Sequence, residues 1–283
     1  MGDGTARAKE ASDITIIDNS FASINTAILW GRSLYLNIRR FIIFQMTINV
    51  AACLIVLYGA FMGLESPLNV TQMLWVNLIM DTFAAMALSS LPADPNVMDD
   101  YPRKTDSKII DGRMASMILS VGLLFFVIMV GMWQMLSHGD YSSVSEMLRN
   151  FDIAHLTDFS KATHMRNPHE LGMFFTFFVL LQFWNIFNSR YYRTGRSLIQ
   201  DLTEMIRHPK TIWKHYSTGF ITIVFVILVG QILITNVFGE FFGVAALSFK
   251  DWILLIAVTC PVLVVGEIIR LFHHKRAYLV KQR

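Results

Sequence analysis

Charged residues are scarce in this sequence. Asp, Glu, Lys and Arg account for 16% of its 283 residues, whereas a soluble domain of this length carries about 25%. Hydrophobic residues account for 54%. The two features together exclude an ordinary soluble domain and indicate a membrane protein. The net charge is only +3, so the chain offers no strongly basic surface and we expect no nucleic-acid partner.

Cysteine is almost absent, and no signal peptide is recognisable. Cys53 and Cys260 lie in apolar runs, and their spacing fits neither a disulfide framework nor a zinc site. Residues 1–18 are polar, carry charges of both signs and lack the apolar core of a secretory signal. Membrane insertion must therefore depend on apolar segments further along the chain.

Six apolar stretches are long enough to cross a bilayer, at about 41–62, 70–90, 114–136, 171–189, 216–238 and 250–269. Basic residues gather before the first stretch, between the second and third, between the fourth and fifth, and after the sixth. The positive-inside rule then predicts a multi-pass membrane protein with both termini in the cytoplasm and the loop 137–169 outside. We expect the surrounding partner to be membrane lipid.

The first span is expected to continue a long helix that starts outside the membrane. Apolar residues recur every three or four positions from Phe21 to Ile42, and no proline interrupts them. A single helix over about 20–61 would be roughly 60 Å long, about twice the hydrocarbon thickness of a bilayer. Its first half must therefore project as a stalk, with Arg39 and Arg40 at the membrane interface.

The N-terminal segment resembles the remainder of a soluble α/β unit. Residues 1–13 are polar, and the β-branched run 14–17 follows them. This pattern predicts a short helix over residues 9–12 and one buried strand. Eighteen residues are too few to bury a core of their own. The stretch 2–5, GDGT, lacks the pattern of a phosphate-binding loop.

The second span carries a carboxylate at bilayer depth. Asn77 and Asp81 lie near the middle of 70–90 and are four residues apart, which places both on one face of an α-helix. No Lys or Arg lies in the interior of any span to neutralise Asp81, so a bound cation or a proton is its natural complement. The two side chains offer hard oxygen ligands, which suit Ca²⁺ better than a soft transition metal.

Other polar residues within the spans leave a structural alternative open. Asn49 in the first span, and Gln182 and Asn185 in the fourth, are amides of a kind that often only bond a neighbouring helix. Glu267 lies three residues before Arg270, which favours an interfacial ion pair. The loop 137–169 contains four histidines whose spacing matches no metal-site pattern.

Several longer motifs resemble one family, the P-type calcium-transporting ATPases of the plasma-membrane type. QMLWVNLIMDTFAAMAL, residues 72–88, is similar to their sixth transmembrane helix, and TFFVLLQFWNIFNSR, residues 176–190, to their eighth. The N-terminal MGDGT and AKEASD resemble the end of their phosphorylation domain, and residues 21–40 resemble the stalk that enters their fifth helix. The resemblance extends over the whole chain.

The resemblance implies an all-α membrane bundle of six transmembrane helices, the fifth to tenth of a ten-helix pump. Residues 1–18 would end the phosphorylation domain, 19–40 would form the cytoplasmic stalk helix, and 41–283 the C-terminal transmembrane domain. Asn77, Asp81 and Asn49 would be metal ligands. Ala52 and Gln182 occupy positions where two-site relatives have Glu, which implies one transported Ca²⁺ per cycle in a cell-membrane protein.

Three family motifs are missing from the sequence: DKTGT, TGES and TGDGxNDxP. We therefore expect ATP and Mg²⁺ to act only in a complete pump, through the first four helices and the actuator, nucleotide-binding and phosphorylation domains. By this interpretation the chain is the C-terminal part of a pump and has no catalytic residue of its own. Two alternatives stay open: a non-catalytic membrane protein that binds or regulates a full-length pump, and a pump for Mn²⁺ or H⁺.

Overall fold

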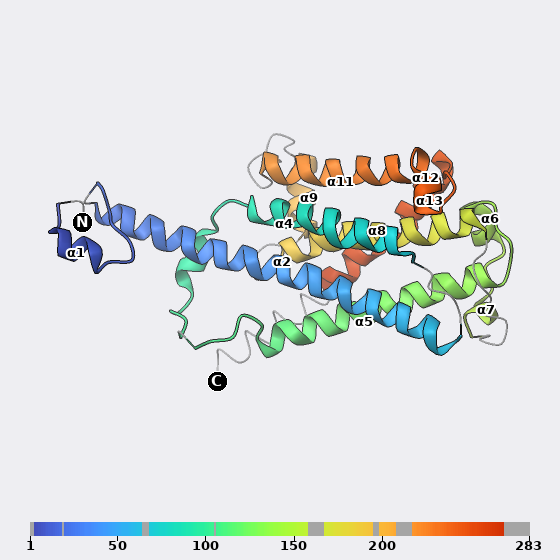
Figure 1. The fold of residues 1–283 in the computed structure, drawn as a ribbon, viewed down its shortest axis with the longest axis horizontal. Helices are drawn as coiled ribbons and strands as arrows, with labels where there is room; N and C mark the ends of the chain where they lie inside the picture. The colour runs from blue at the N-terminus through green and yellow to red at the C-terminus, as the bar shows by residue number, and fades with distance from the viewer. Residues whose placement is uncertain are drawn as a thin grey trace.

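The computed structural model of the chain describes residues 3–18, 20–63, 68–104, 106–157, 167–194, 198–207 and 217–268. Within these ranges the protein is helical and contains no strand (Figure 1). Six helices are long and apolar enough to cross a membrane, which confirms the predicted all-α membrane bundle. They are α2 at Phe21–Phe61, α3 to α4 at Val70–Ser89, α5 at Gly112–Ser137, α8 at Pro168–Arg190, α11 at Thr218–Asn236 and a final span at Phe249–Ile268.

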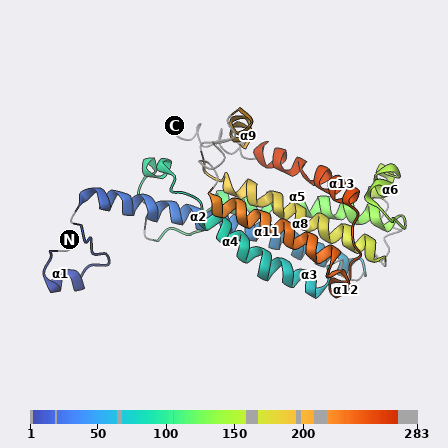
Figure 2. The same ribbon diagram turned by 90° about the horizontal axis from the view of Figure 1, so that it is seen from above.

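Helix α2 is a single helix of 41 residues. At about 1.5 Å per residue it is roughly 60 Å long, which is twice what a bilayer core requires. Its first half projects beyond the other helices, and its second half packs among them (Figures 1 and 2). Buried residues begin only at Ser33, as expected of a helix that leaves the bundle. The predicted continuous stalk helix is therefore confirmed.

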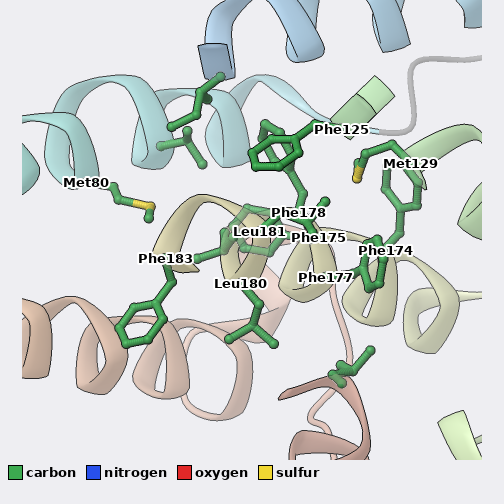
Figure 3. Packing of buried hydrophobic residues seen from close by; sticks show 14 of the residues in the cluster. Met80, Phe125, Met129, Phe174, Phe175, Phe177, Phe178, Leu180, Leu181 and Phe183 are labelled. Atoms are coloured by element: carbon green, nitrogen blue, oxygen red, sulfur yellow. The ribbon is translucent and has the colours of Figure 1, made fainter. Parts of the chain in front are cut away.

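Helix α8 forms the centre of the bundle. It is mostly apolar and is buried on nearly all of its faces, and a helix of that kind is stable only when neighbours surround it. Here α2, α4, α5, α11 and α13 pack against it. Its aromatic side chains are at the middle of the core, with Phe174 and Phe175 0% exposed and Phe178 1% exposed (Figure 3).

The final span is broken near its middle. Its first part, α13 (Phe249–Thr259), ends before Cys260, and helical structure resumes at Pro261 and continues to Ile268. A proline is tolerated at the first turn of a helix because the missing N–H has no intrahelical partner there. The sequence Cys260–Pro261 thus accounts for the position of the break.

Short helices cover the two ends of the bundle. Helices α6 (Val144–Arg149), α7 (Ile153–Thr157) and α12 (Gly239–Phe242) lie at the end opposite the stalk (Figure 1). At the stalk end lie the 3-10 helix η2 (Pro95–Asp99) and α9 (Leu198–Arg207), and α9 is seen nearly end-on in Figure 2. Helix α9 therefore lies across the direction of the spans.

The N-terminal segment differs from its prediction. Its helix, α1, spans Ala6–Glu10, where the Thr5 hydroxyl accepts a hydrogen bond from the N–H of Ala8. The predicted strand is absent from the described residues, because 14–17 are irregular, and Ile14 and Ile17 are 73% and 89% exposed. A strand requires a hydrogen-bonded neighbour, and the described residues provide none.

Arginines fasten α2 to the connecting loops where it enters the bundle. Arg39 and Arg40 are each 3% exposed. Arg39 pairs with Asp111, and its guanidinium donates to the Tyr192 hydroxyl at 3.1 Å, while Arg40 donates to the Tyr192 carbonyl at 3.2 Å. Nearer the tip of the stalk, Arg32 donates to the carbonyls of Val97, in the middle of η2, and of Asp100, directly after it. The base of the stalk therefore carries buried, paired charge.

We predict that Asp111→Asn lowers the thermal stability of the protein at neutral pH. Partial burial would raise the pKa of the Asp111 carboxyl, but the N–H of Met114 and the hydrogen bond and charge of Arg39 outweigh it and lower that pKa below the ordinary 3.8. Asparagine keeps the N-cap oxygen for Met114 but removes the charge that faces Arg39. Because the carboxylate is 47% exposed, the expected loss is about 1 kcal/mol or less.

The ion pair of Arg39 and Asp111 makes the difference in stability between the parent protein and Asp111→Asn depend on pH. A carboxylate whose pKa is lowered by folding stabilises the fold above its unfolded value of 3.8, and the effect is lost as the pH falls through the folded value. Thermal unfolding of both proteins in detergent, at neutral and at acid pH, measures this difference. An equal difference at both pH values would contradict the ion-pair explanation.

Candidate cation-binding site

The second span departs from α-helical geometry just before Asp81. It consists of α3 (Val70–Leu74), the π-helix η1 (Trp75–Met80) and α4 (Asp81–Ser89). The hydrogen bonds of a π-helix join residues five apart, so the turn contains an additional residue, and such turns are frequent at functional sites. Asp81 is the first residue after this turn.

Asp81 is buried, and its carboxylate accepts no aligned hydrogen bond in the described part of the chain. It is 3% exposed, and neither carboxylate oxygen accepts a hydrogen bond or forms an ion pair there. Asp251 is equally buried, but its oxygens accept from the N–H of Val144 at 2.8 Å and the hydroxyl of Ser248 at 2.6 Å. An unpaired buried carboxylate is costly, so Asp81 has the environment of a group that binds a cation or a proton.

The stretch of α2 that packs against α4 carries two amides. The side chain of Gln45 lies within reach of the Asp81 carboxylate and interacts favourably with its charge, although the two groups are not aligned as a hydrogen bond. Asn49, half-buried, is one turn further along the same helix. Gln45 was not predicted from the sequence. Its position four residues before Asn49, in an otherwise apolar run, is the signal that could have identified it.

Asn77 lies in a different environment from Asp81. Its side chain is exposed, and so is that of Leu78, which is 64% exposed. The prediction that Asn77 and Asp81 share one face assumed an α-helix, whereas Asn77 belongs to η1. Asn77 is exposed whereas Asp81 is 3% exposed, and no hydrogen bond joins their side chains among the described residues.

The central helix α8 brings two further amides to the same region. Asn185 donates to the carbonyl of Phe44 on α2, at 3.5 Å, which matches the structural role considered for it. Gln182 is 0% exposed, and neither its amide oxygen nor its nitrogen has a hydrogen-bond partner among the described residues. Because Phe44 is adjacent to Gln45, α2 places these amides close to the level of Asp81 in the bundle.

The donor set of this region consists of oxygens. Side chains from α2, η1, α4 and α8 supply one carboxylate and several amides. Hard cations with oxygen ligands, such as Ca²⁺, fit this set. The described residues contain no group of three or more His, Cys, Asp or Glu that could hold a metal. A cation here would therefore depend on amide and carbonyl oxygens beside Asp81.

Two other candidates lie away from this region. In the loop 137–169, the rings of His138 and His155 stack with centroids 4.6 Å apart, an arrangement of packing rather than of a common ligand, and His164 lies outside the described residues. Glu267 is 2% exposed and accepts from the N–H of Leu198 at 3.4 Å. Its predicted partner Arg270 lies outside the described residues.

Comparison with known proteins identifies the relatives of this sequence. Residues 65–272 match the family described as "Cation transporting ATPase, C-terminus". The chain is 33% identical to calcium-transporting ATPase 10, plasma membrane-type, of Arabidopsis thaliana over 273 residues, which are 94% of this chain. It is 32% identical to plasma membrane calcium-transporting ATPase 1 of Homo sapiens over 279 residues, or 99% of this chain. These alignments cover 22% and 21% of the two relatives, so the chain spans less than a quarter of their length.

We predict that Asp81→Asn stabilises the protein when no cation is added. The substitution removes a buried charge that accepts no hydrogen bond, so the free energy of unfolding should rise on the order of 1 kcal/mol. Asp251→Asn is the matched control, because Asp251 is buried to the same extent but accepts two hydrogen bonds. It should lower stability by about 1–2 kcal/mol.

Thermal unfolding in detergent with a chelator measures both changes. If the two substitutions destabilise the protein equally, the charge of Asp81 is already compensated by a partner in the folded protein and no cation is needed to balance it.

Proposed function

This chain belongs to the plasma-membrane-type calcium-transporting ATPases and corresponds to their C-terminal membrane region, and from this premise we propose that it forms the ion-transporting part of an ATP-driven Ca²⁺ pump. The observation that carries the proposal is the Asp81 carboxylate, which is 3% exposed and makes no hydrogen bond or ion pair in the described chain. A transported cation would supply the missing charge.

The proposed site consists of Asp81, Asn77 and Asn49. Asp81 supplies the negative charge, and the two amides supply neutral oxygens. Ca²⁺ takes six to eight oxygen ligands, so further oxygens are needed, and Gln45 lies near enough to Asp81 to contribute one. The exposed face of η1 that carries Asn77 would meet helices that the longer relatives have in addition.

A single Ca²⁺ per cycle follows from the charge of the site. Ala52 and Gln182 are both buried, 2% and 0% exposed, and neither carries a charge. Asp81 is then the acid that balances the ion in this region. A second divalent ion beside it would leave uncompensated positive charge in a low-dielectric environment, which is strongly unfavourable.

The stalk provides a mechanical connection to the site. Helix α2 runs without a break from Phe21 through Gln45 and Asn49, so a rotation at its outer end would move the two amides against Asp81. Residues 1–18 would end the phosphorylation domain, 19–40 would form the stalk and 41–283 the membrane domain. ATP hydrolysis and the Mg²⁺ that it requires would belong to the parts that make the relatives longer.

The distribution of basic residues supports an orientation in the membrane. Arg39, Arg40 and Arg193 all belong to the stalk end of the bundle, and the positive-inside rule places that end in the cytoplasm. Both termini would then be cytoplasmic and the loop 137–169 external. The plasma-membrane relatives favour the cell membrane as the location.

A second candidate function has its own support. In five of the six spans, most of the residues in the apolar window are not buried inside the bundle. Such a surface suits packing against further membrane helices as well as lipid. The chain would then bind or regulate a full-length pump without transporting an ion itself, and it would co-purify with that pump.

We predict that Asp81→Asn abolishes high-affinity transport in an assembled pump. The chain is joined to the preceding part of a plasma-membrane relative, and ATP-dependent uptake of radioactive calcium into vesicles is measured. Removing one partner of a buried charge pair costs about 3–5 kcal/mol, so the apparent Ca²⁺ affinity should fall on the order of a hundredfold or more.

Asp106→Asn is the control, because it removes the same charge from an exposed loop position and should leave uptake unchanged. Competition by Mn²⁺, and uptake at several pH values, distinguish Ca²⁺ from the alternative ions. Parental transport by the Asp81→Asn protein would refute the assignment of Asp81.

A further inference from the structure

The indole ring of Trp75 is tied to α11 at the residue where η1 begins. Its Nε1–H donates to the Oε1 atom of Gln231, at 3.1 Å. Gln231 is 1% exposed, and Trp75 is half-buried. An indole N–H can only donate, and it needs an acceptor when it is removed from water. Gln231 provides that acceptor within an otherwise apolar helix.

The residue before Gln231 allows the ring to approach the helix closely. A Cβ atom at Gly230 would lie 3.0 Å from Cη2 of Trp75 and 3.3 Å from its Cζ2, which is closer than ordinary van der Waals contact. Only glycine lets the indole lie against the backbone of α11 at this distance. Gly230 and Gln231 therefore form one receptor for the Trp75 side chain.

Helix α11 packs along α4 in the second span, and two further contacts lie at the ends of the span. At one end, the side chains of Asn69 and Gln72 donate to the carbonyl of Phe242 on α12, at 2.7 and 3.0 Å. At the other end, the hydroxyls of Ser90 and Ser217 are 3.1 Å apart. Of the helices around it, α11 is the one against which α4 packs most extensively.

Between these ends, η1 has one side-chain hydrogen bond to another helix in the described part of the chain, and it is the bond from Trp75 to Gln231. A π-helical turn is rare in an isolated helix, and tertiary contacts have to maintain it. The hydrogen bond to Gln231 is made by Trp75, the first residue of the π-helical turn, and Asp81 directly follows the last residue of that turn. A change in the turn would therefore rotate or shift Asp81.

We infer that Gln231 is a positioning residue for the cation site, which acts through Trp75 to hold the π-helical turn in place. This inference rests on the proposed function for its effect on Ca²⁺, but not for its effect on the turn. Gln231 makes no hydrogen bond to Asp81, whose carboxylate oxygens have no such partner among the described residues. It holds the side chain of Trp75, the first residue of η1, and the chain continues from Trp75 through Asn77 to Asp81.

The first test concerns the turn and uses the chain without any assay of transport. Gln231→Met keeps the length of the side chain but removes the acceptor. Hydrogen exchange of the backbone amides of residues 76–80, followed by mass spectrometry in detergent, should become roughly five- to tenfold faster, as expected for the loss of one buried hydrogen bond. Ile232→Met, at the adjacent and 38% exposed position, is the control and should not change the exchange.

A double-substitution cycle shows whether the effect passes through the bond. Trp75→Phe removes the donor and should accelerate exchange in the same segment by a similar factor. In the protein with both substitutions the factor should equal that of either one alone, because the same bond is lost once. Additive factors, or unchanged exchange in Gln231→Met, would overturn the inference.

The second test concerns the ion and uses the assembled pump. Gln231→Met should raise the Ca²⁺ concentration for half-maximal uptake about five- to tenfold and leave the maximal rate within about twofold, whereas Ile232→Met should change neither. A fall in maximal rate alone would indicate a general structural role and overturn the positioning role. If exchange responds as expected but Asp81→Asn transports normally, the proposed function fails and the tie to the turn still stands.

Discussion

One unpaired carboxylate constrains the rest of this structure. Asp81 lies within a bundle whose other buried acid of equal exposure, Asp251, is fully engaged in hydrogen bonds. Water is scarce in such an interior, and an ion without a partner costs several kcal/mol. The protein has to offset that cost with favourable packing elsewhere, and the mostly apolar α8, buried against five neighbouring helices, supplies it. Packing around Asp81 leaves only 3% of the residue exposed.

The fold connects Asp81 to the stalk through α2 and to the rest of the bundle through α11. Helix α2 passes from the projecting stalk to Gln45 beside Asp81, while the arginines at its base hold it to the loops at the stalk end. On the other side, α11 holds the π-helical turn through Trp75. Asp81 thus follows directly on a turn tied to α11 by the Trp75 side chain, and α2, which continues into the stalk, packs against its helix α4. This arrangement suits a site whose access changes while its ligands stay assembled.

Hydropathy was sufficient to predict the six spans to within a few residues, and the absence of proline predicted the continuous α2, because both depend on local chain properties. Residues 14–17 were wrongly assigned to a strand, since the pattern favours a strand only where a neighbouring strand exists. At the site, burial of Asp81 was foreseeable from its apolar surroundings. The hydrogen bond between Trp75 and Gln231 was not, because the two residues lie 156 positions apart in the sequence. The exposure of Asn77 was not foreseeable either, because it depends on which helices lie beside η1.

The most direct test of the account is the position of the ion itself. An electron cryo-microscopy structure of the assembled pump with Ca²⁺ should show density at about 2.3–2.6 Å from a carboxylate oxygen of Asp81, with amide or carbonyl oxygens completing the shell. A lysine or arginine from the remainder of the pump paired with Asp81, with the ion bound elsewhere, would contradict it.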